Sequence, residues 1–458
     1  DDDLTVTDDM TVGGTLGVTG IATFTDDIII GDGKTIGSAS DVDAMTIAAN
    51  GQVTFTQTLI GTALDISGDI DVDGTTNLDV IDVDGAANFA ADVTFAAGAD
   101  IITASTGNGQ NVRVGVDAGS SIASGGNQNV LLGDLAGAAV NTGDGNIAIG
   151  FEAGNDITTG SYNTIMGWKA GDKISTGAQN TAIGDGAIGA DTLGQKSVAV
   201  GSNALNQQNF TTATDSYNVA VGYNAGQGIT TGVNNTLIGG LAGDALTSGG
   251  SNVAIGFQAL STEDAHGNNV AVGYRALKTL NVGATAYNTA VGNDAGLSMT
   301  YGVNNTLVGG LAGDALTGSA DYSGGANNVA VGRAALGADT LGSSSVAIGF
   351  ETLLAQNFTT TTESVNTAVG HRAGLAVTIG VENTLIGGYA GDALTDAGYN
   401  VAIGARALGA DTLGSRSVAI GQGALSSQNF TTATNTSNVA VGYDAGLAIT
   451  TGTSNTFV

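Results

Sequence analysis

The most regular feature of the chain is a nine-residue phrase of polar and apolar positions that recurs from residue 111 onward. Most copies open with Asn or Ser, continue through apolar positions to a central Gly, and close with Ala followed by Gly or Leu, as in Asn146–Gly154. Of the 18 spacings between the 19 complete copies, 12 are 17 residues, and such a period indicates stacked structural units. The central glycines are residues 115, 133, 150, 167, 184, 201, 222, 239, 256, 273, 292, 309, 332, 349, 370, 387, 404, 421 and 442.

A period of 17 residues predicts one turn of a parallel β-solenoid, with about 20 such rungs in all. Repeats built from helices usually need about 30 residues or more, whereas a solenoid turn needs two short strands and two tight turns. Val and Ile in the phrase favour strands, and Gly permits the turns. We expect two strands of about five residues per rung, with the Asn side chains stacked as a ladder that bonds the next turn's backbone.

Both faces of the strand in this phrase are apolar. In Val198-Ala199-Val200, the first and third residues share one face and Ala199 has the other. The outer pair is aliphatic or Thr in nearly every copy, and the middle residue is apolar in 18 of 19 copies, with Arg113 as the exception. Because a solenoid needs only one buried face per strand, we expect another copy of the chain to cover the second face.

A longer period of four copies lies on top of the 17-residue repeat. Gly201, Gly273, Gly349 and Gly421 each begin a block of four copies. Three blocks carry four extra residues after their first copy, in Asn-Phe-Thr-Thr segments that contain Phe210, Phe358 and Phe430. A continuous ladder leaves room for extra residues only in the turns. The final residues, 455–458, stop one residue short of the next expected glycine, so we expect the repeat to continue.

Residues 1–105 differ in composition from residues 106–458. They contain 19 Asp, no Glu and a single basic residue, Lys34, and they show short alternating stretches separated by Gly or Asp-Gly turns. A single chain with so many Asp residues is not expected to form a well-packed core by itself. We therefore expect a β-rich, intertwined shaft over 1–105, followed by the repetitive β-roll over 106–458.

Composition excludes several classes of function. The 458-residue chain has a formal net charge of −31, which repels nucleic acid and anionic membranes. It contains no Cys and only two His, His266 and His371, so disulfides are impossible and a His-based catalytic or zinc site has little to build on. No stretch approaches about 20 consecutive apolar residues, so we expect no membrane insertion. We expect no enzymatic activity.

One candidate metal site lies in the acidic N-terminal part. Asp69, Asp71, Asp73 and Gly74 imitate the opening of an EF-hand loop, but the twelfth position is Val80 and not Glu. The simpler interpretation is strand alternation, with Ile and Val inward and Asp outward. The alternative that we retain is Ca²⁺ shared between chains.

Candidate contact residues follow the central glycines and occupy the inserted segments. The position directly after the glycine varies most and is often aromatic, which would suit contact with a glycan, although packing within the turns is the alternative. The inserted segments would be either contacts or braces between chains. The candidate receptor contacts are Phe151, Trp168, Tyr223, Phe257, Tyr274, Phe210, Phe358 and Phe430.

The phrases Asn146-Ile-Ala-Ile-Gly150, Ser197-Val-Ala-Val-Gly201 and Ser417-Val-Ala-Ile-Gly421 resemble the head repeats of trimeric autotransporter adhesins of the YadA-like type. The resemblance covers about 111–458 and implies left-handed parallel β-rolls packed as a parallel homotrimer that binds host or matrix surfaces. The present period of 17 residues is longer than that family's rung, and no neck, coiled-coil stalk or membrane anchor is visible. The wording of residues 22–38 resembles tail-fibre proteins of phages of aquatic bacteria, which often carry the same roll.

The function we expect from this resemblance is structural. The first hypothesis is a segment of a trimeric phage tail fibre, on the virion, that reaches toward or binds a glycan or protein receptor on the host surface. The second is the head of a bacterial trimeric autotransporter adhesin. The third is a self-assembling extracellular filament protein. All three place the protein on a virion or an extracellular surface.

Overall fold

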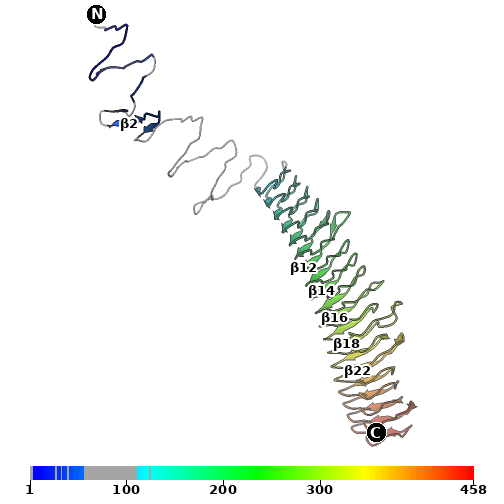
Figure 1. The fold of residues 1–458 in the computed structure, drawn as a ribbon. Coiled ribbons are helices and arrows are strands. Elements are labelled where there is room, and N and C mark those ends of the chain that lie inside the picture. Colours follow the sequence, from blue (N-terminus) through cyan, green and yellow to red (C-terminus); the bar gives the residue numbers. More distant parts are fainter. Residues whose placement is uncertain (1–3, 26–27, 32–33, 39–40, 56–110, 123–124) are drawn as a thin grey trace. The chain divides into compact units, whose positions relative to one another are not determined.

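The computed structural model describes residues 4–25, 28–31, 34–38, 41–55, 111–122 and 125–458 (Figure 1). The Ca²⁺ candidates Asp69, Asp71 and Asp73 lie outside these residues, as does much of the expected shaft. The chain divides into two units, Asp1–Ala96 and Ala97–Val458, and each is described by itself. The described residues are all-β and contain no helix, so they include no helix that could cross a membrane.

The first unit contains a three-stranded antiparallel sheet. Its strands are β1 (Lys34–Ser38), β2 (Asp41–Ile47) and β3 (Val53–Phe55), paired in chain order. Two hydrogen bonds close the turn between β2 and β3: the Ala48 amide donates to the Gln52 carbonyl, and the Gly51 amide donates to the Ala48 carbonyl. Many apolar side chains in the described part of this unit remain exposed, among them Leu4, Ile21 and Ile29 at 80%, 93% and 91%.

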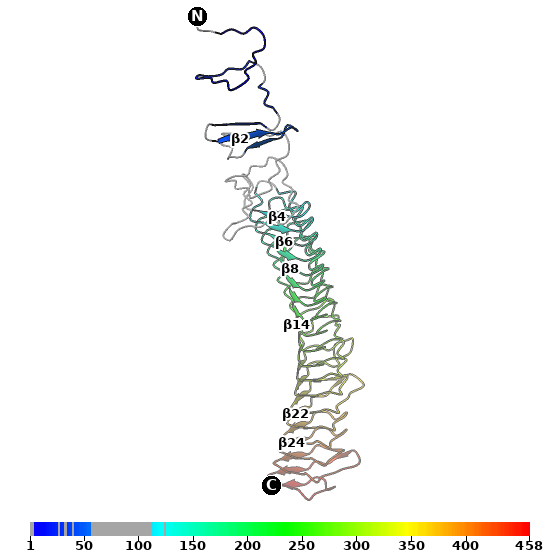
Figure 2. The ribbon, with the colours of Figure 1, turned by 60° about the vertical axis from the view of Figure 1, so that its left-hand side comes forward.

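The second unit is a parallel β-solenoid, as the repeat predicted. Twenty strands stack in chain order into one parallel sheet; β4 pairs only with β5 and β29 only with β28 among the described residues, so the stack has two ends (Figure 2). The strands of this sheet are β4 (Val112–Val114), β5 (Val130–Leu132), β6 (Ile147–Ile149), β7 (Thr164–Met166), β8 (Thr181–Ile183), β10 (Val198–Val200), β12 (Val219–Val221), β13 (Thr236–Ile238), β14 (Val253–Ile255), β15 (Val270–Val272), β16 (Thr289–Val291), β17 (Thr306–Val308), β18 (Val329–Val331), β20 (Val346–Ile348), β22 (Thr367–Val369), β23 (Thr384–Ile386), β24 (Val401–Ile403), β26 (Val418–Ile420), β28 (Val439–Val441) and β29 (Thr456–Phe457).

In the main sheet each rung contributes one strand of three residues, or two at β29, and only six of the described rungs add a second strand, of two residues, so the prediction of two five-residue strands per rung was wrong. The reason lies in the backbone after each central glycine. Gly150 has φ 130°, and Glu152, Gly154 and Tyr162 follow in the left-handed region at 55°, 56° and 60°. These residues curl the chain instead of extending it. Hydrogen bonds between rungs nevertheless continue through the curled segment, for example from the Gly137 amide to the Ala153 carbonyl at 2.9 Å.

The central glycine is required by stacking as well as by its φ angle. A Cβ built on Gly150 would lie 2.5 Å from the carbonyl oxygen of Gly167, the central glycine of the next rung. The backbones of successive rungs therefore approach too closely for any side chain at this position. The register is the same along the sheet, with Ala199 opposite both Ala182 and Ala220.

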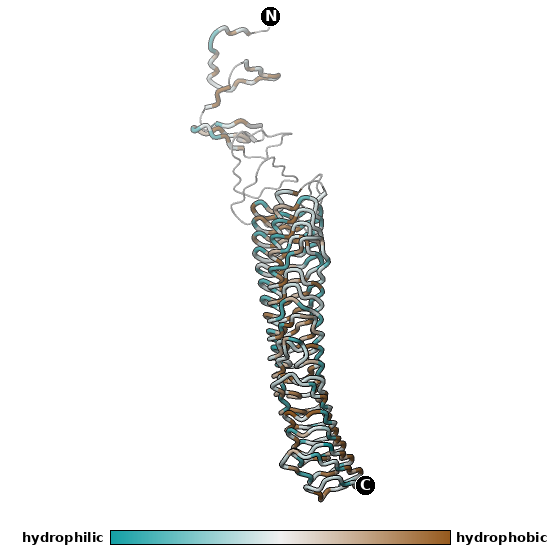
Figure 3. Tube along the Cα trace, turned by 90° about the vertical axis from the view of Figure 1, so that its right-hand side faces the viewer, coloured by the Kyte–Doolittle hydropathy of each residue, from teal (hydrophilic) through white to brown (hydrophobic). Residues whose placement is uncertain are grey.

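The middle residue of each strand points into the solenoid and the outer pair points away. Ala148, Ala199 and Leu237 are fully buried within one chain, whereas Ile238 and Val221 remain 38% and 36% exposed. Hydrophobic residues recur in columns along the stack in Figure 3. The two apolar faces predicted from the sequence are thus one face inside the solenoid and one on its surface.

The predicted asparagine ladder is confirmed. The backbone amide of Asn146 donates to Oδ1 of Asn129 at 2.9 Å, and Nδ2 of Asn146 donates to the carbonyl of Gly160 in the next rung at 2.9 Å. Asn163 repeats both bonds one rung later. The buried side chain of each Asn therefore ties its rung to the rung before and the rung after.

Two alternative side-chain arrangements fill the core beyond the strand. Where the fourth residue after the central glycine is Gly, as at Gly154, the seventh is apolar, and a Cβ on Gly154 would lie 2.8 Å from Cδ1 of Ile157. Where the fourth residue is Leu, as at Leu205 with φ 50°, the buried leucine side chain occupies the core position that Ile157 fills in the other arrangement. The seventh residue is then usually polar, as at Gln208. Leu277, followed by buried Leu280, departs from this exchange.

The extra residues of the longer spacings lie between the strands of the sheet, as predicted. At three insertions they form additional short parallel ladders, which leave the main ladder in register. These ladders pair β9 (Gly194–Gln195) with β11 (Thr214–Asp215), β19 (Gly342–Ser343) with β21 (Thr362–Glu363), and β25 (Gly414–Ser415) with β27 (Thr434–Asn435).

Candidate functional site

Aromatic side chains line one edge of the solenoid at the position directly after the central glycine. Phe151 and Trp168, on successive rungs, stack with ring centroids 6.5 Å apart, and Phe257 and Tyr274 stack at 5.9 Å. These four rings are between 41% and 55% exposed, and Tyr223 in the same column is 60% exposed. The five predicted contact residues therefore lie on the surface. Four of their rings stack in pairs between successive turns, and part of each of the five rings remains exposed to solvent.

Basic side chains lie against these rings. Lys169 Nζ is 4.9 Å from the Trp168 ring centroid, and the Arg275 guanidinium is 4.9 Å from that of Tyr274. Arg275 also pairs with Asp294 at 2.8 Å. In a chain that is strongly acidic as a whole, these side chains place positive charge directly beside exposed rings.

A third aromatic group occupies rungs 349–387. Phe350 and His371 stack at 5.4 Å, and Tyr389 meets the His371 ring edge-on at 5.0 Å. Arg372 pairs with Glu351 at 2.9 Å. His371 is exposed, and among the described residues its ring makes these two aromatic contacts and no ion pair.

The phenylalanines of the inserted segments lie inside the molecule. Phe210, Phe358 and Phe430 are only 5%, 4% and 6% exposed. Their backbone amides donate to the buried carboxylates of Asp191, Asp339 and Asp411, respectively. Their rings are therefore not accessible to a ligand at the surface of this chain, and they are not candidate contact residues.

Each inserted segment covers the same buried polar network. In the first, Oδ1 of Asp191 accepts from the Gly194 amide at 2.9 Å, and Gln208 Nε2 donates to Oδ2 of Asp191 at 2.6 Å and to Ser197 Oγ at 2.8 Å. Asn218 Nδ2 donates to Oε1 of Gln208 at 2.9 Å, which rejoins the asparagine ladder. The Asp339 and Asp411 networks repeat these contacts.

These networks explain why Ser replaces Asn in the three rungs that open at 197, 345 and 417. The shorter side chain leaves room for the Gln amide, which donates to the Ser hydroxyl and accepts from the following Asn. Burial raises the pKa of Asp339 above its ordinary value, and the hydrogen bond from Gln356 acts in the opposite direction. Because every partner is engaged, the networks have a structural role and leave no group free for chemistry.

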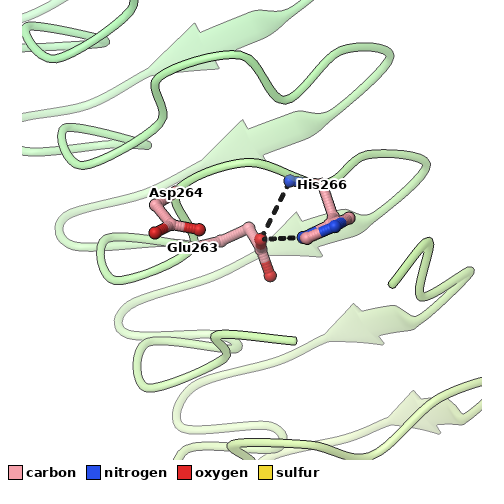
Figure 4. A group of neighbouring side chains, drawn as sticks. All are labelled: Glu263, Asp264 and His266. Atoms are coloured by element: carbon pink, nitrogen blue, oxygen red, sulfur yellow. Dashed lines mark hydrogen bonds and ion pairs between the residues drawn. The ribbon is translucent and has the colours of Figure 1, made fainter. Parts of the chain in front are cut away.

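One group of potential metal ligands occurs among the described residues: Glu263, Asp264 and His266 (Figure 4). Glu263 is fully buried, and its two carboxylate oxygens accept from the backbone amides of His266 at 3.1 Å and Val282 at 3.2 Å. Nδ1 of His266 lies 3.6 Å from Oε1 of Glu263. Burial is the main cause that raises the pKa of Glu263.

The backbone contacts of Glu263 match those of the inserted segments. Asp191 likewise accepts from the amides three and nineteen residues further along the chain, those of Gly194 and Phe210. Glu263 is therefore the fourth member of the same family of buried turn anchors. We interpret it as structural, because its oxygens already satisfy two backbone amides.

A pocket of about 490 Å³ opens beside the third aromatic group. Its lining combines the small residues Gly409 and Ala410 with charged and polar side chains. The residues that line it are Tyr389, Asp392, Arg406, Gly409, Ala410 and Ser426. None of these residues was predicted from the sequence as a site residue, although the four-rung blocks differ from one another at positions 389, 406 and 426.

No protein-family model, curated protein or solved structure matches the chain.

Proposed function

We propose that the protein is a structural fibre protein, a segment of a trimeric phage tail fibre that reaches toward or binds the host cell surface. The proposal assigns it no enzymatic activity and places it on the virion. The observation that carries it is the outer face of the long parallel sheet. A rod of stacked rungs with an uncovered apolar face suits a fibre whose strands associate along their length.

The outer face consists of the two residues that flank the buried middle residue of each strand. Aliphatic side chains of the second flanking position remain exposed to a similar degree along much of the stack. They include Val221 36%, Ile238 38%, Val291 36%, Val308 36%, Ile348 37%, Ile386 38%, Ile420 37% and Val441 40%. A continuous apolar strip of this kind marks an interaction surface rather than scattered exposure.

We propose that two further copies of this chain cover the strip. A partner with the same 17-residue rung presents the same spacing of aliphatic side chains along the whole stack, which an unrelated globular partner does not. Buried apolar surface contributes about 25 cal/mol per Å², so contact repeated over 20 rungs adds up to a stable association. The exposed apolar side chains of the first unit are consistent with intertwining there as well.

Mass measurement by sedimentation equilibrium at micromolar concentration tests the assembly. We expect a species of three times the 44.6 kDa of one chain. Ile386→Asp should reduce the assembly, because three carboxylates would be buried in the apolar strip. Ile379→Asp is the matched control, because Ile379 is 53% exposed and lies outside the strands. A monomer for the unaltered chain would overturn the trimer.

The biological setting needs a separate test. Electron microscopy of native phage particles, labelled with antibody raised against residues 111–458, should decorate the tail fibres. Decoration of bacterial surfaces in the absence of phage would favour the adhesin alternative instead.

A further inference from the structure

The pocket beside Tyr389 arises from three side-chain changes that coincide in space. The four-rung repeat gives three successive sets, each with one residue equivalent to Tyr389, one equivalent to Arg406 and one equivalent to Ser426, and only the residues of the third set line the pocket. Where the third set has Tyr389, Arg406 and Ser426, the second has Leu311, Ala334 and Leu354, and the first has Leu241, Gln258 and Lys278.

The comparison with the second set shows why the third is hollow. A Cβ on Gly337 would lie 3.1 Å from Cδ1 of Leu354, so the leucine covers that glycine. At the corresponding Gly409, the nearest atoms belong to Arg406 and Asp392, and Ser426 is too short to reach. The cavity therefore depends on Ser426 standing where Leu354 stands one block earlier.

The walls of the pocket carry an unpaired cation and a partly desolvated carboxylate. The Arg406 guanidinium lies 5.8 Å from the Tyr389 ring centroid. In the described part of the chain it forms no ion pair, unlike Arg275 and Arg372. Burial is the main cause that raises the pKa of Asp392, and the nearby Arg406 acts in the opposite direction.

This combination suits a ligand that has an anionic group and several hydroxyl donors. Guanidinium pairs well with carboxylate, and a carboxylate such as Asp392 or a hydroxyl such as Ser426 accepts from sugar hydroxyls. A phosphate dianion would be repelled by Asp392 more strongly than a uronate monoanion, and it carries no hydroxyl groups that could donate to that carboxylate. An acidic peptide has several carboxylates and few hydroxyl donors. The volume of about 490 Å³ is within the usual range for small-ligand sites.

We propose that this pocket binds an acidic sugar, a uronate residue of a surface polysaccharide, with its carboxylate on Arg406 and its hydroxyls on Asp392 and Ser426. The inference rests on the proposed function, since it names the chemical class of the host-surface receptor. The exposed rings of Phe350 and His371 extend from the pocket along the stack and offer apolar contact to neighbouring sugar residues of the same polymer.

The test is titration of the full chain with trigalacturonate, followed by isothermal calorimetry or ligand-observed NMR. We expect saturable binding, and its fully methyl-esterified form should bind about tenfold more weakly or worse, because the charge-assisted bond to Arg406 is lost. Arg406→Ala and Ser426→Leu should each weaken binding by about tenfold or more. Both substitutions copy residues that the chain already carries in the corresponding rungs, so folding is not at risk.

Arg416→Ala is the matched control, because Arg416 lies over the Tyr399 ring at 5.6 Å but outside the pocket. It should leave binding unchanged. Absence of binding at millimolar trigalacturonate, equal binding of the ester, or unaltered binding by both pocket variants would overturn the inference. Sedimentation of the same samples distinguishes the two proposals. A trimer that does not bind the sugar would refute only the proposed ligand of the pocket, whereas a monomer would refute the proposed fibre assembly.

Discussion

At the scale of single residues, the fold depends on buried amides as much as on apolar side chains. Most middle residues of the strands are Ala, which bury little area each. The Asn ladder adds a geometric constraint, because each side chain must meet the backbone of a neighbouring rung at hydrogen-bond distance. Buried polar groups of this kind are costly when they lose a partner.

The ladder predicts a specific loss of stability. Asn163→Ala removes two bonds donated by the side chain and the one that its Oδ1 accepts from the Asn180 amide. We expect the free energy of unfolding to fall by roughly 2–4 kcal/mol, because buried backbone groups lose their partners. Chemical denaturation followed by circular dichroism measures the change. Asn155→Ala, at a partly exposed position of the preceding turn, should change it by less than about 0.5 kcal/mol.

The buried Glu263 predicts a pH effect of defined sign. Its pKa is raised above the ordinary 4.5, so the folded state binds this proton more tightly than the unfolded state. Glu263 therefore stabilises the fold less as the pH rises from 4.5 through the raised pKa. When the pH is lowered from 7.5 to 5, the unaltered protein should gain stability relative to Glu263→Gln, which cannot titrate. Parallel denaturation curves with a constant difference would contradict the assignment.

At the scale of the rung, most of the architecture could be predicted from the sequence, but the path of the chain between the strands could not. The 17-residue period, the solenoid, the ladder and the location of the insertions could be predicted, because each depends on a spacing. The short length of the strands could not, because the chain curls after them through left-handed conformations at non-glycine residues such as Glu152 and Leu205, which their residue types do not predict. The aromatic position after the central glycine was identified from the sequence, with glycan contact and turn packing both left open. The burial of Phe210, Phe358 and Phe430 within one chain was not predicted.

Two further features of the structure are encoded in combinations of positions along the sequence. The fourth and the seventh residue after the central glycine vary together. Gly at the fourth position occurs with an apolar residue at the seventh, as in Gly154 and Ile157, and Leu at the fourth occurs mostly with a polar residue, as in Leu205 and Gln208. The pocket required the blocks to be compared at positions 389, 406 and 426 together. Each of those differences looks unremarkable in the linear sequence, because the residues are neighbours only across rungs.

The inserted segments provide a prediction at this scale. Phe358→Ala should lower the free energy of unfolding by about 3–5 kcal/mol, because a nearly buried ring is removed beside the Asp339 network. Phe257→Ala removes the same atoms from a 46% exposed ring and should cost less than about 1.5 kcal/mol. Equal effects of the two substitutions, measured by denaturation, would mean that the inserted phenylalanines are surface residues.

At the scale of the whole solenoid, stacking fixes the length. Hydrogen-bonded strands are about 4.8 Å apart, so the 20 strands from β4 to β29 span roughly 90–95 Å. Cryo-electron microscopy should resolve a stack of this length with a repeat of about 4.8 Å, whichever biological setting is correct. A compact particle, or a repeat near 10 Å along the stack, would contradict the solenoid.

Site-specific cross-linking tests the proposal that copies of the chain associate in parallel and in register through the outer face of the sheet. The chain has no Cys, so Ile386→Cys places a single thiol on that face. A short bismaleimide should link chains through position 386, whereas Ile379→Cys, off the face, should give little product. In a mixture of Ile386→Cys and Ile238→Cys chains, links should join like positions only. Predominant links between 386 and 238, or efficient linking through 379 alone, would rule out parallel, in-register association through this face.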